Sequence, residues 1–173
     1  MLESEIENFL NQKSQQSDPK MIQRFRHRLQ GGNLTRDSNA HSHFCVYFAA
    51  YDIDEEEFFI GHHIKSDLWL FNGGHIELNE SLEDTVKREM KEEWGRECSL
   101  TIPQPQKISF TKIESQPKMC CKEHYNFWYF IEVDKVNFHP KQECLAHEFH
   151  EALWVNKHEA LSLVTDFETR QTI

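Results

Sequence analysis

The sequence predicts an α+β fold in which a mixed β-sheet lies between helices. Segments rich in β-branched and aromatic residues occur both before and after one strongly capped helical pattern at residues 81–95. A second helical pattern follows the last of these segments, and the first 30 residues also carry apolar residues at helical spacing. Strands followed by a helix, more strands and a final helix are typical of a sheet covered by helices.

The first 32 residues are expected to form two helices ahead of the main domain. Ile6 and Phe9 belong to a short apolar stripe, Pro19 suits the first position of a second helix, and a glycine pair at 31–32 ends it. Thirty residues cannot bury a core of their own. We therefore expect residues 1–32 to be a helical extension packed on a domain of residues 33–173.

Seven segments have the composition of strands. Residues 43–51 are apolar on both faces, as expected for a central strand, and residues 57–64 follow an acidic turn, which predicts antiparallel pairing with them. The predicted strands are 43–51, 57–64, 67–71, 97–102, 107–114, 124–133 and 151–155. Asn156 is a suitable N-cap for a last helix that extends to about Leu163.

The central helix has clear start and stop signals. Ser81 is a good N-cap, Asp84 completes an acidic capping box, and Gly95 is a natural residue at which to end the helix. At about 100° per residue, Glu89 and Glu93 fall on the same arc as the apolar residues of the helix. Glu92 flanks that arc, and the lysines at 87 and 91 lie opposite it.

Three carboxylates at positions i, i+3 and i+4 repel each other unless a cation lies between them. Because Glu89 and Glu93 point toward the core, they need a metal ion, a proton or an arginine. Clustered hard oxygen ligands suit Mg²⁺ or Mn²⁺ better than zinc. The alternative is that residues 89–93 form a solvated charged run.

Around this helix the sequence resembles the Nudix box, which has fixed spacing. Only the last position departs, with Arg96 where the family has an apolar residue. The residues in register are Gly74, Glu80, Arg88, Glu89, Met90, Glu92, Glu93 and Gly95. The resemblance implies a Nudix-type α/β/α sandwich and a Mg²⁺- or Mn²⁺-dependent hydrolase of diphosphate bonds.

The resemblance also implies roles for single residues. Glu89, Glu92 and Glu93 match the metal ligands and catalytic carboxylates, with Glu92 either a ligand or the general base. Arg88 would orient a catalytic carboxylate, and Glu80 would tie the loop to the helix. The remaining implied metal ligands are the main-chain carbonyl of Gly74 and the side chain of Glu77, for which a hydrogen bond within the loop is the alternative.

A late acidic segment before a Trp-bearing strand also resembles the family. Glu148 and Glu151 both qualify as a metal contact or base, with Glu148 preferred, and either could instead be an exposed loop residue. Residues 62–77 further resemble a bacterial Nudix subgroup that has proline where this chain has Asn72. His62, Lys65 and His75 are candidate phosphate contacts, although alternation along a strand puts only one of the pair 62–63 on the site face.

Charge and cysteine content limit the partners and the compartment. The formal net charge of −10 disfavours broad binding to nucleic acid or to anionic membranes. No apolar run approaches about 18 residues, so no membrane span is expected. Five cysteines without a signal peptide indicate reduced thiols and a cytoplasmic protein. A zinc site at Cys144, His147 and His150 with Cys120–Cys121 is not expected, because the spacing lacks a paired ligand frame.

The expected reaction is hydrolysis of a nucleoside diphosphate linked to another moiety, by attack of an activated water on phosphorus. One alternative is a nucleotide-binding regulatory module without turnover. Another is a pyrophosphohydrolase of RNA 5′ ends, for which the basic cluster on the second predicted helix is the only sign. That cluster is otherwise a solvated helix face or a contact to a second subunit in a homodimer, and it comprises Lys20, Arg24, Arg26 and Arg28.

Overall fold

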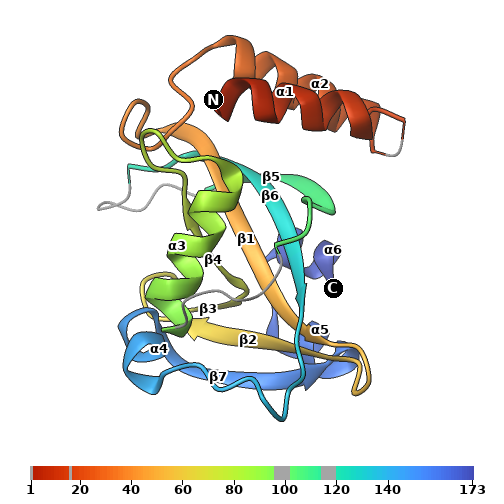
Figure 1. Cartoon of the computed structure of the whole chain (residues 1–173), viewed down its shortest axis with the longest axis vertical. Coiled ribbons are helices and arrows are strands. Elements are labelled where there is room, and N and C mark those ends of the chain that lie inside the picture. Colours follow the sequence, from red (N-terminus) through yellow and green to blue (C-terminus); the bar gives the residue numbers. More distant parts are fainter. Residues whose placement is uncertain (1, 16, 96–101, 114–119) are drawn as a thin grey trace.

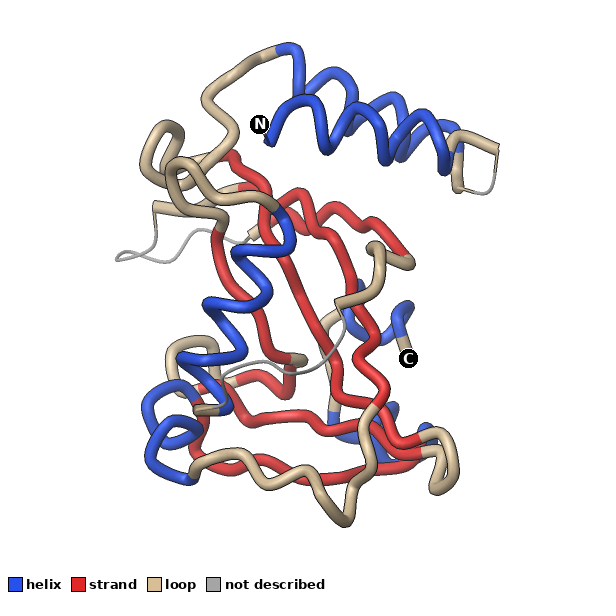
Figure 2. Tube along the Cα trace, viewed as in Figure 1, coloured by secondary structure: helices blue, strands red, loops and turns tan. Residues whose placement is uncertain are grey.

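The computed structural model describes residues 2–15, 17–95, 102–113 and 120–173. Within these ranges a mixed sheet is covered by helices on both faces (Figures 1 and 2). The helices are α1 Leu2–Lys13, α2 Pro19–Gln30, α3 Leu82–Trp94, α4 Gln142–Glu148, α5 Lys157–Leu163 and α6 Phe167–Thr172. The strands are β1 Ser42–Asp52, β2 Glu57–His63, β3 Leu68–Leu70, β4 Asn72–His75, β5 Lys107–Lys112, β6 Glu123–Glu132 and β7 Phe149–Asn156.

The sheet is organised around β1. Its strand order is β3-β2-β1-β6-β5, while β4 pairs with β1 and β7 pairs with β2. Strands β1 and β6 run parallel, and the other pairs are antiparallel. The predicted mixed sheet and the antiparallel β1–β2 pair are therefore confirmed.

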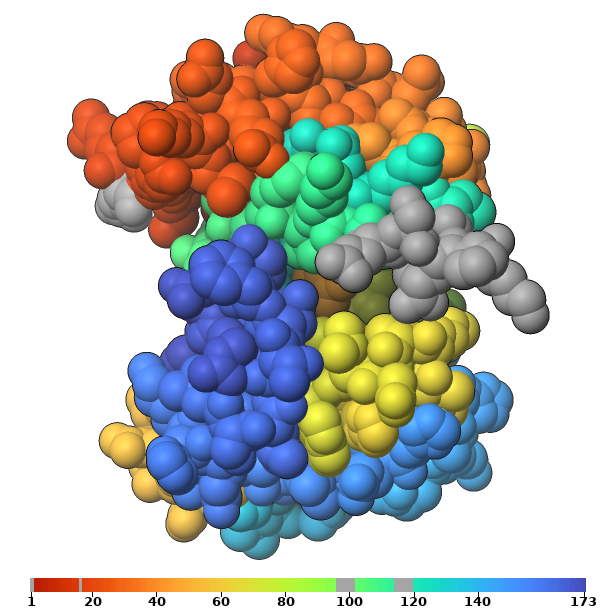
Figure 3. Space-filling view, turned by 180° about the vertical axis from the view of Figure 1, so that it is seen from behind, coloured from red at the N-terminus to blue at the C-terminus, as the bar shows by residue number. Residues whose placement is uncertain are grey.

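Side chains of β1 alternate between two cores, as expected for a strand covered on both faces. Phe44 and Phe48 face α2 and α3, where they contact the rings of Phe25 and Trp94. Ala49 faces the other way and belongs to a smaller core under α5. Seen from behind, the C-terminal segment covers part of this second face (blue in Figure 3). We call these the α3 face and the α5 face.

The N-terminal helices form where predicted and pack on the domain. Phe9 of α1 and Phe25 of α2 contact the ring of Phe127 on β6 edge-on. The expected solvated basic face is wrong for Arg28, which is buried. Its guanidinium donates to the main-chain carbonyls of Gly32, at 2.8 Å, and Asn33, which follow α2, and to that of Ser42 at the start of β1.

Four elements differ from the predictions. Strand β4 forms where a glycine turn was expected, because its backbone pairs with β1. The sequence predicts a loop where α4 forms and no element where α6 forms. Strand β7 is longer than expected. The predicted strand at 97–102 lies almost wholly outside the described residues. Among the residues that are described, no helix combines the length and the apolar character needed to cross a bilayer.

Candidate active site

Helix α3 begins and ends at the residues that the sequence predicts. Ser81 Oγ accepts the N–H of Asp84 at 3.0 Å, and the Asp84 carboxylate accepts the N–H of Ser81 at 3.2 Å. Gly95 ends the helix with a left-handed φ of 66°. Glu5 of α1 also contributes, since its carboxylate accepts the Leu82 N–H at 3.1 Å at the positive end of the helix dipole.

The rotation of α3 buries two of the three glutamates. Glu89 is 8% exposed and Glu93 is 5% exposed, whereas the Glu92 side chain is 59% exposed. The burial predicted from helical periodicity is therefore confirmed, and the solvated-run alternative is wrong for Glu89 and Glu93. Glu89 and Glu93 thus face the core, and Glu92 lies at the solvent edge of the same helix.

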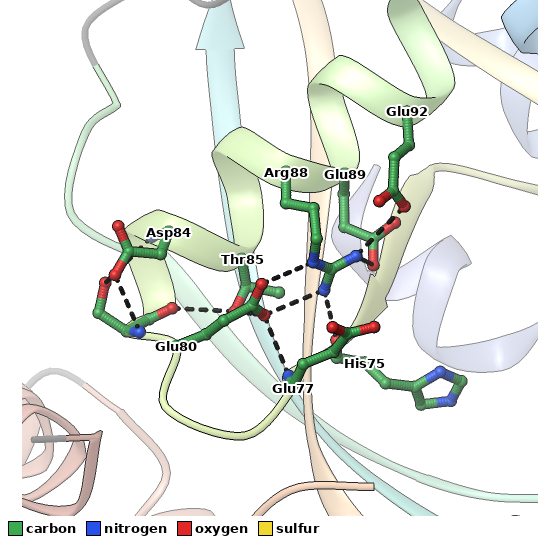
Figure 4. Close-up of polar contacts among 9 residues, drawn as sticks. His75, Glu77, Glu80, Asp84, Thr85, Arg88, Glu89 and Glu92 are labelled. Atoms are coloured by element: carbon green, nitrogen blue, oxygen red, sulfur yellow. Dashed lines mark hydrogen bonds and ion pairs between the residues drawn. The ribbon is translucent and has the colours of Figure 1, made fainter. Parts of the chain in front are cut away.

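Arg88 joins the glutamates to the loop before α3 (Figure 4). Its Nε and Nη2 donate to the two oxygens of Glu80, at 2.6 and 3.0 Å, in a bidentate pair. Nη1 donates to Glu89 Oε1 at 2.7 Å and to Glu92 Oε2 at 3.3 Å. Arg88 is therefore placed to orient the carboxylate of Glu92.

Glu80 connects the loop to the helix. One of its oxygens accepts both the main-chain N–H of Glu77 and the hydroxyl of Thr85, each at 3.0 Å. Arg88 Nη2 also donates to the His75 carbonyl oxygen at 2.9 Å, at the end of β4. Burial is the largest single influence and acts to raise the pKa of Glu80, but the hydrogen bonds from Arg88, the Glu77 N–H and Thr85, with the charge of Arg88, together lower that pKa, so Glu80 is a carboxylate.

Glu93 lies against the start of β4. Asn72 Nδ2 donates to Glu93 Oε2, and the Gly73 N–H donates to Glu93 Oε1 at 3.3 Å. Burial raises the pKa of Glu93 to about 8, and the nearby charges of Glu89 and Glu148 contribute. The sequence predicts Asn72 only as a turn residue tolerant of left-handed geometry, whereas it is extended in β4 and its side chain binds Glu93.

Gly74 allows Glu89 to approach the backbone of β4. A Cβ added at Gly74 would lie 1.8 Å from Glu89 Oε1, so no other residue fits without moving that carboxylate. Burial also raises the pKa of Glu89, although the charge on Arg88 opposes the shift. The carboxylate and the main chain at the first glycine of the box are thus brought together.

The donor set fits a hard divalent cation. Glu89 and Glu93 are buried carboxylates with raised pKa values, which is the arrangement that a bound cation stabilises. The buried oxygen Asn72 Oδ1 has no hydrogen-bond partner beside them. Oxygen donors without sulfur or imidazole favour Mg²⁺ or Mn²⁺. Glu77 is exposed, and only its main chain is seen to contribute to the loop.

Glu148 and Lys65 form an ion pair near this region. Glu148 is the last residue of α4 rather than a loop residue, and Lys65 Nζ lies 3.0 Å from Glu148 Oε2. His63 Nε2 lies 3.4 Å from the same oxygen. Since the Glu148 charge contributes to the raised pKa of Glu93, the two carboxylates interact electrostatically.

The other candidate residues lie elsewhere. Of the pair 62–63, it is His63 that shares the α3 face, while His62 lies on the α5 face, where it stacks on Trp69 and pairs with Asp67 at 2.9 Å. Glu151 is exposed on β7, opposite His62 in the sheet register. His75 also faces away from α3 and meets His124, 3.3 Å between Nε2 atoms.

Two features were missed by the sequence reasoning. Asn72 as a partner of Glu93 could have been suspected, because a polar residue replaces the proline usual in the subgroup. The histidines at 43, 75 and 124 were missed because they are distant in sequence and meet only through strand pairing. Burial lowers the pKa of His75 to about 2 and that of His124 to about 3, so both imidazoles are neutral.

The fold is shared with solved structures of low sequence identity. The E. coli dihydroneopterin triphosphate pyrophosphohydrolase is 18% identical with a TM-score of 0.59, and the match covers 74% of this chain and 90% of that one. The C. elegans Ap4A hydrolase is 17% identical with a TM-score of 0.54, and the match covers 74% of this chain and 90% of that one. A MutT protein from Methanosarcina mazei Go1 is 18% identical with a TM-score of 0.56, and the match covers 75% of this chain and 87% of that one. No curated protein matches the sequence.

A family model decides the relationship. The NUDIX domain model matches residues 45–172, which is most of the chain and includes every residue of the carboxylate site on α3. The glycine, arginine and glutamates at fixed spacing occupy β4, the loop after it and α3, as described above. The chain therefore belongs to the Nudix family, and it is a hydrolase that acts on pyrophosphate bonds.

Proposed function

We propose that this protein is a divalent-metal-dependent hydrolase that cleaves the diphosphate bond of a nucleoside diphosphate linked to another moiety. The observation that carries the proposal is the juxtaposition of two buried glutamates, one exposed glutamate and the main chain at Gly74 around one side of α3. When bound, Mg²⁺ or Mn²⁺ would neutralise phosphate oxygens and make a coordinated water more acidic.

The chain's own residues take separate parts in the reaction. Glu89, Glu93 and the Gly74 carbonyl would hold the metal, with Glu77 as an additional ligand from the loop. Glu92 is exposed to solvent and would accept the proton of the attacking water, while Arg88 would hold its carboxylate in place. The water oxygen forms a new bond to phosphorus, and the bond between phosphorus and the bridging oxygen breaks, leaving that oxygen on the departing phosphate.

Two other residues are assigned to the substrate end of the site. Lys65 offers an ammonium group beside Glu148, at 3.0 Å, and its side chain is 70% exposed. A phosphate that competes for Lys65 would release Glu148 toward the metal site, so that Glu148 serves as a second base or metal contact. The names of the solved pyrophosphohydrolase and Ap4A hydrolase specify phosphoanhydride compounds, which supports a phosphoanhydride as the substrate.

The RNA 5′ end is not favoured as the substrate. The basic cluster on α2 was its only support, and its three arginines already have partners within the chain. Arg28 is buried on main-chain carbonyls, Arg26 donates to Asn11 at 3.0 Å, and the Arg24 guanidinium lies 4.0 Å from the ring centre of Phe110. We propose instead that residues 1–32 are a structural extension of the domain 33–173 that supports the start of α3 through Glu5.

Turnover of a compound panel tests the proposed function. Purified protein with Mg²⁺ or Mn²⁺ should release phosphorylated products from nucleoside diphosphates linked to a sugar or to a second nucleoside. Hydrolysis in ¹⁸O-labelled water should place the label on a phosphate. Glu89→Gln, prepared identically, controls for contaminating phosphatases. Inert protein across these compounds, nucleoside triphosphates, RNA 5′ ends and polyphosphates would overturn the proposal, and tight nucleotide binding without turnover would identify a regulatory module.

Gly74→Ala should impair the site more than the fold. The added Cβ requires the Glu89 carboxylate to move, which costs about 1–2 kcal/mol of stability by overpacking. We expect turnover to fall at least about tenfold, because a displaced metal ligand misplaces the reacting groups. Gly31→Ala is the matched control, since its new Cβ meets nothing closer than 3.3 Å. Equal turnover in both variants would show that Glu89 need not lie against Gly74.

A further inference from the structure

The α5 face of the sheet holds a cluster of nitrogen and sulfur ligands separate from the glutamates. His43 and Cys45 lie on β1, His75 on β4 and His124 on β6. Strand register brings them together, because Cys45 pairs with His75 and His43 pairs with His124. His43 and Cys45 are almost fully buried, and His124 is 8% exposed. We call these four residues the His₃Cys cluster.

The cluster is compact enough to surround one metal ion. One ligand atom from each of the four residues lies within 4.8 Å of all the others. The Nε2 atoms of His75 and His124 are 3.3 Å apart. A tetrahedral zinc ion with bonds of about 2.05 Å to nitrogen and 2.3 Å to sulfur holds two nitrogens about 3.3 Å apart and a nitrogen and a sulfur about 3.6 Å apart.

A second cysteine lies at the edge of the cluster. The Sγ atom of Cys121 is 3.8 Å from His43 Nε2 and 3.8 Å from His75 Nε2. Cys121 is buried, and all four cysteines among the described residues are free thiols. The site thus offers five nitrogen or sulfur donors and no carboxylate, which is unlike the oxygen donors of the glutamate site.

The orientation of His43 suits metal binding. Its Nδ1 lies 2.8 Å from the Asn39 carbonyl oxygen, which can only accept a hydrogen bond, so Nδ1 carries the proton. Nε2 therefore directs a lone pair into the cluster. A ligating histidine commonly donates its other N–H to a carbonyl in this way, which fixes the tautomer and the ring orientation.

We propose that His43, Cys45, His75 and His124 bind one Zn²⁺ ion, with Cys121 as an adjacent thiol that can replace Cys45 as the sulfur ligand. Thiolate and imidazole are zinc ligands, whereas Mg²⁺ prefers oxygen. With four protein ligands and no open position the ion is structural rather than catalytic. It is distinct from the cation at the glutamates, since neighbouring residues of β4 face opposite sides and only Gly74 faces Glu89.

The zinc ion would fix the end of β4. His75 contributes its side chain to the His₃Cys cluster and its carbonyl oxygen to Arg88, at 2.9 Å. A metal bond to the imidazole would therefore hold that carbonyl in place and join β4 to β1 and β6. This binding of zinc does not depend on the substrate of the enzyme or on its turnover.

Metal content tests the site directly. Protein purified without added zinc and dialysed against excess Mg²⁺ should retain about one zinc per chain in elemental analysis. His124→Asn should lower that content several-fold, and so should the double substitution Cys45→Ser with Cys121→Ser. Cys144→Ser, a half-buried cysteine outside the cluster, and Glu92→Gln should leave it unchanged. Zinc content that falls in Glu92→Gln but not in His124→Asn would overturn the proposal.

Cobalt gives a readout that survives a folding defect in the variants. Co²⁺ added to the apo form of the unmodified chain should produce a thiolate-to-cobalt charge-transfer band and the strong visible bands of tetrahedral cobalt. The glutamate site cannot produce the charge-transfer band, because it has no sulfur ligand. Absence of both retained zinc and the charge-transfer band in the unmodified chain would show that the cluster is not a metal site.

Discussion

Glu92→Gln should lower the turnover number by about two to four orders of magnitude, the range contributed by a positioned general base. Glutamine keeps the size of the side chain but cannot take the proton of the attacking water. The Glu92 side chain is 59% exposed and its contact to Arg88 is 3.3 Å long, so its loss should change the free energy of unfolding by only about 0.5 kcal/mol. Steady-state kinetics and denaturant unfolding measure the two effects.

Glu83→Gln is the matched control for this experiment. It removes a carboxylate from the same helix, where Glu83 forms an exposed i,i+4 pair with Lys87. We expect its turnover to equal that of the unmodified enzyme. If Glu92→Gln also keeps near-normal turnover, the base is Glu93, Glu148 or Glu151. Glutamine substitutions of these three residues, made one at a time, would then identify the base.

The local part of the site could be read from the sequence because it lies within one helix and its caps. Ser81 and Gly95 set the ends of α3, and the helical period then places Glu89 and Glu93 on the buried arc, with Glu92 at its edge. Each of these properties depends on residues only a few positions apart. Cap chemistry and periodicity are enough to predict such features.

Contacts made across the sheet could not be read in the same way. Strand β4 consists of Asn72, Gly73, Gly74 and His75, which have little strand propensity, and it forms because β1 offers its backbone groups. The side chain of Asn72 therefore reaches Glu93 from a strand that the sequence does not announce. The contact between Lys65 and Glu148 likewise needs α4, a short helix that was missed.

The His₃Cys cluster shows the same limit more sharply. Its members have no regular spacing in the sequence, and the parallel register of β1 with β6 decides that His43 meets His124. A local search for metal motifs instead considers Cys144, His147 and His150, which share one helix and its following strand. Only the sheet topology, in which both β4 and β6 pair with β1, brings the four residues of the His₃Cys cluster together.

Glu93 should make the stability of the protein depend on pH when no divalent cation is present. Its pKa is raised from 4.5 to about 8 in the folded state, so the folded protein keeps a proton that the unfolded chain has lost. Stability is then highest below the unfolded pKa and decreases as the pH rises toward about 8. Between about pH 5 and pH 8 this single group should cost about 3 kcal/mol.

Denaturant unfolding at several pH values, in buffer without added divalent cation, measures this loss. Glu93→Gln resembles the protonated carboxyl group and should be more stable than the unmodified protein by about that amount at pH 8, but nearly equal to it at about pH 5. Saturating Mg²⁺ should restore the stability of the unmodified protein at pH 8 and have little effect on the stability of Glu93→Gln, because the cation replaces the proton as the partner of the buried carboxylate.

Glu83→Gln controls for the loss of a charge from α3, and its stability should follow that of the unmodified protein at every pH. Parallel pH profiles for Glu93→Gln and the unmodified protein would show that Glu93 is already ionised in the folded state, held by Asn72 and the Gly73 N–H alone.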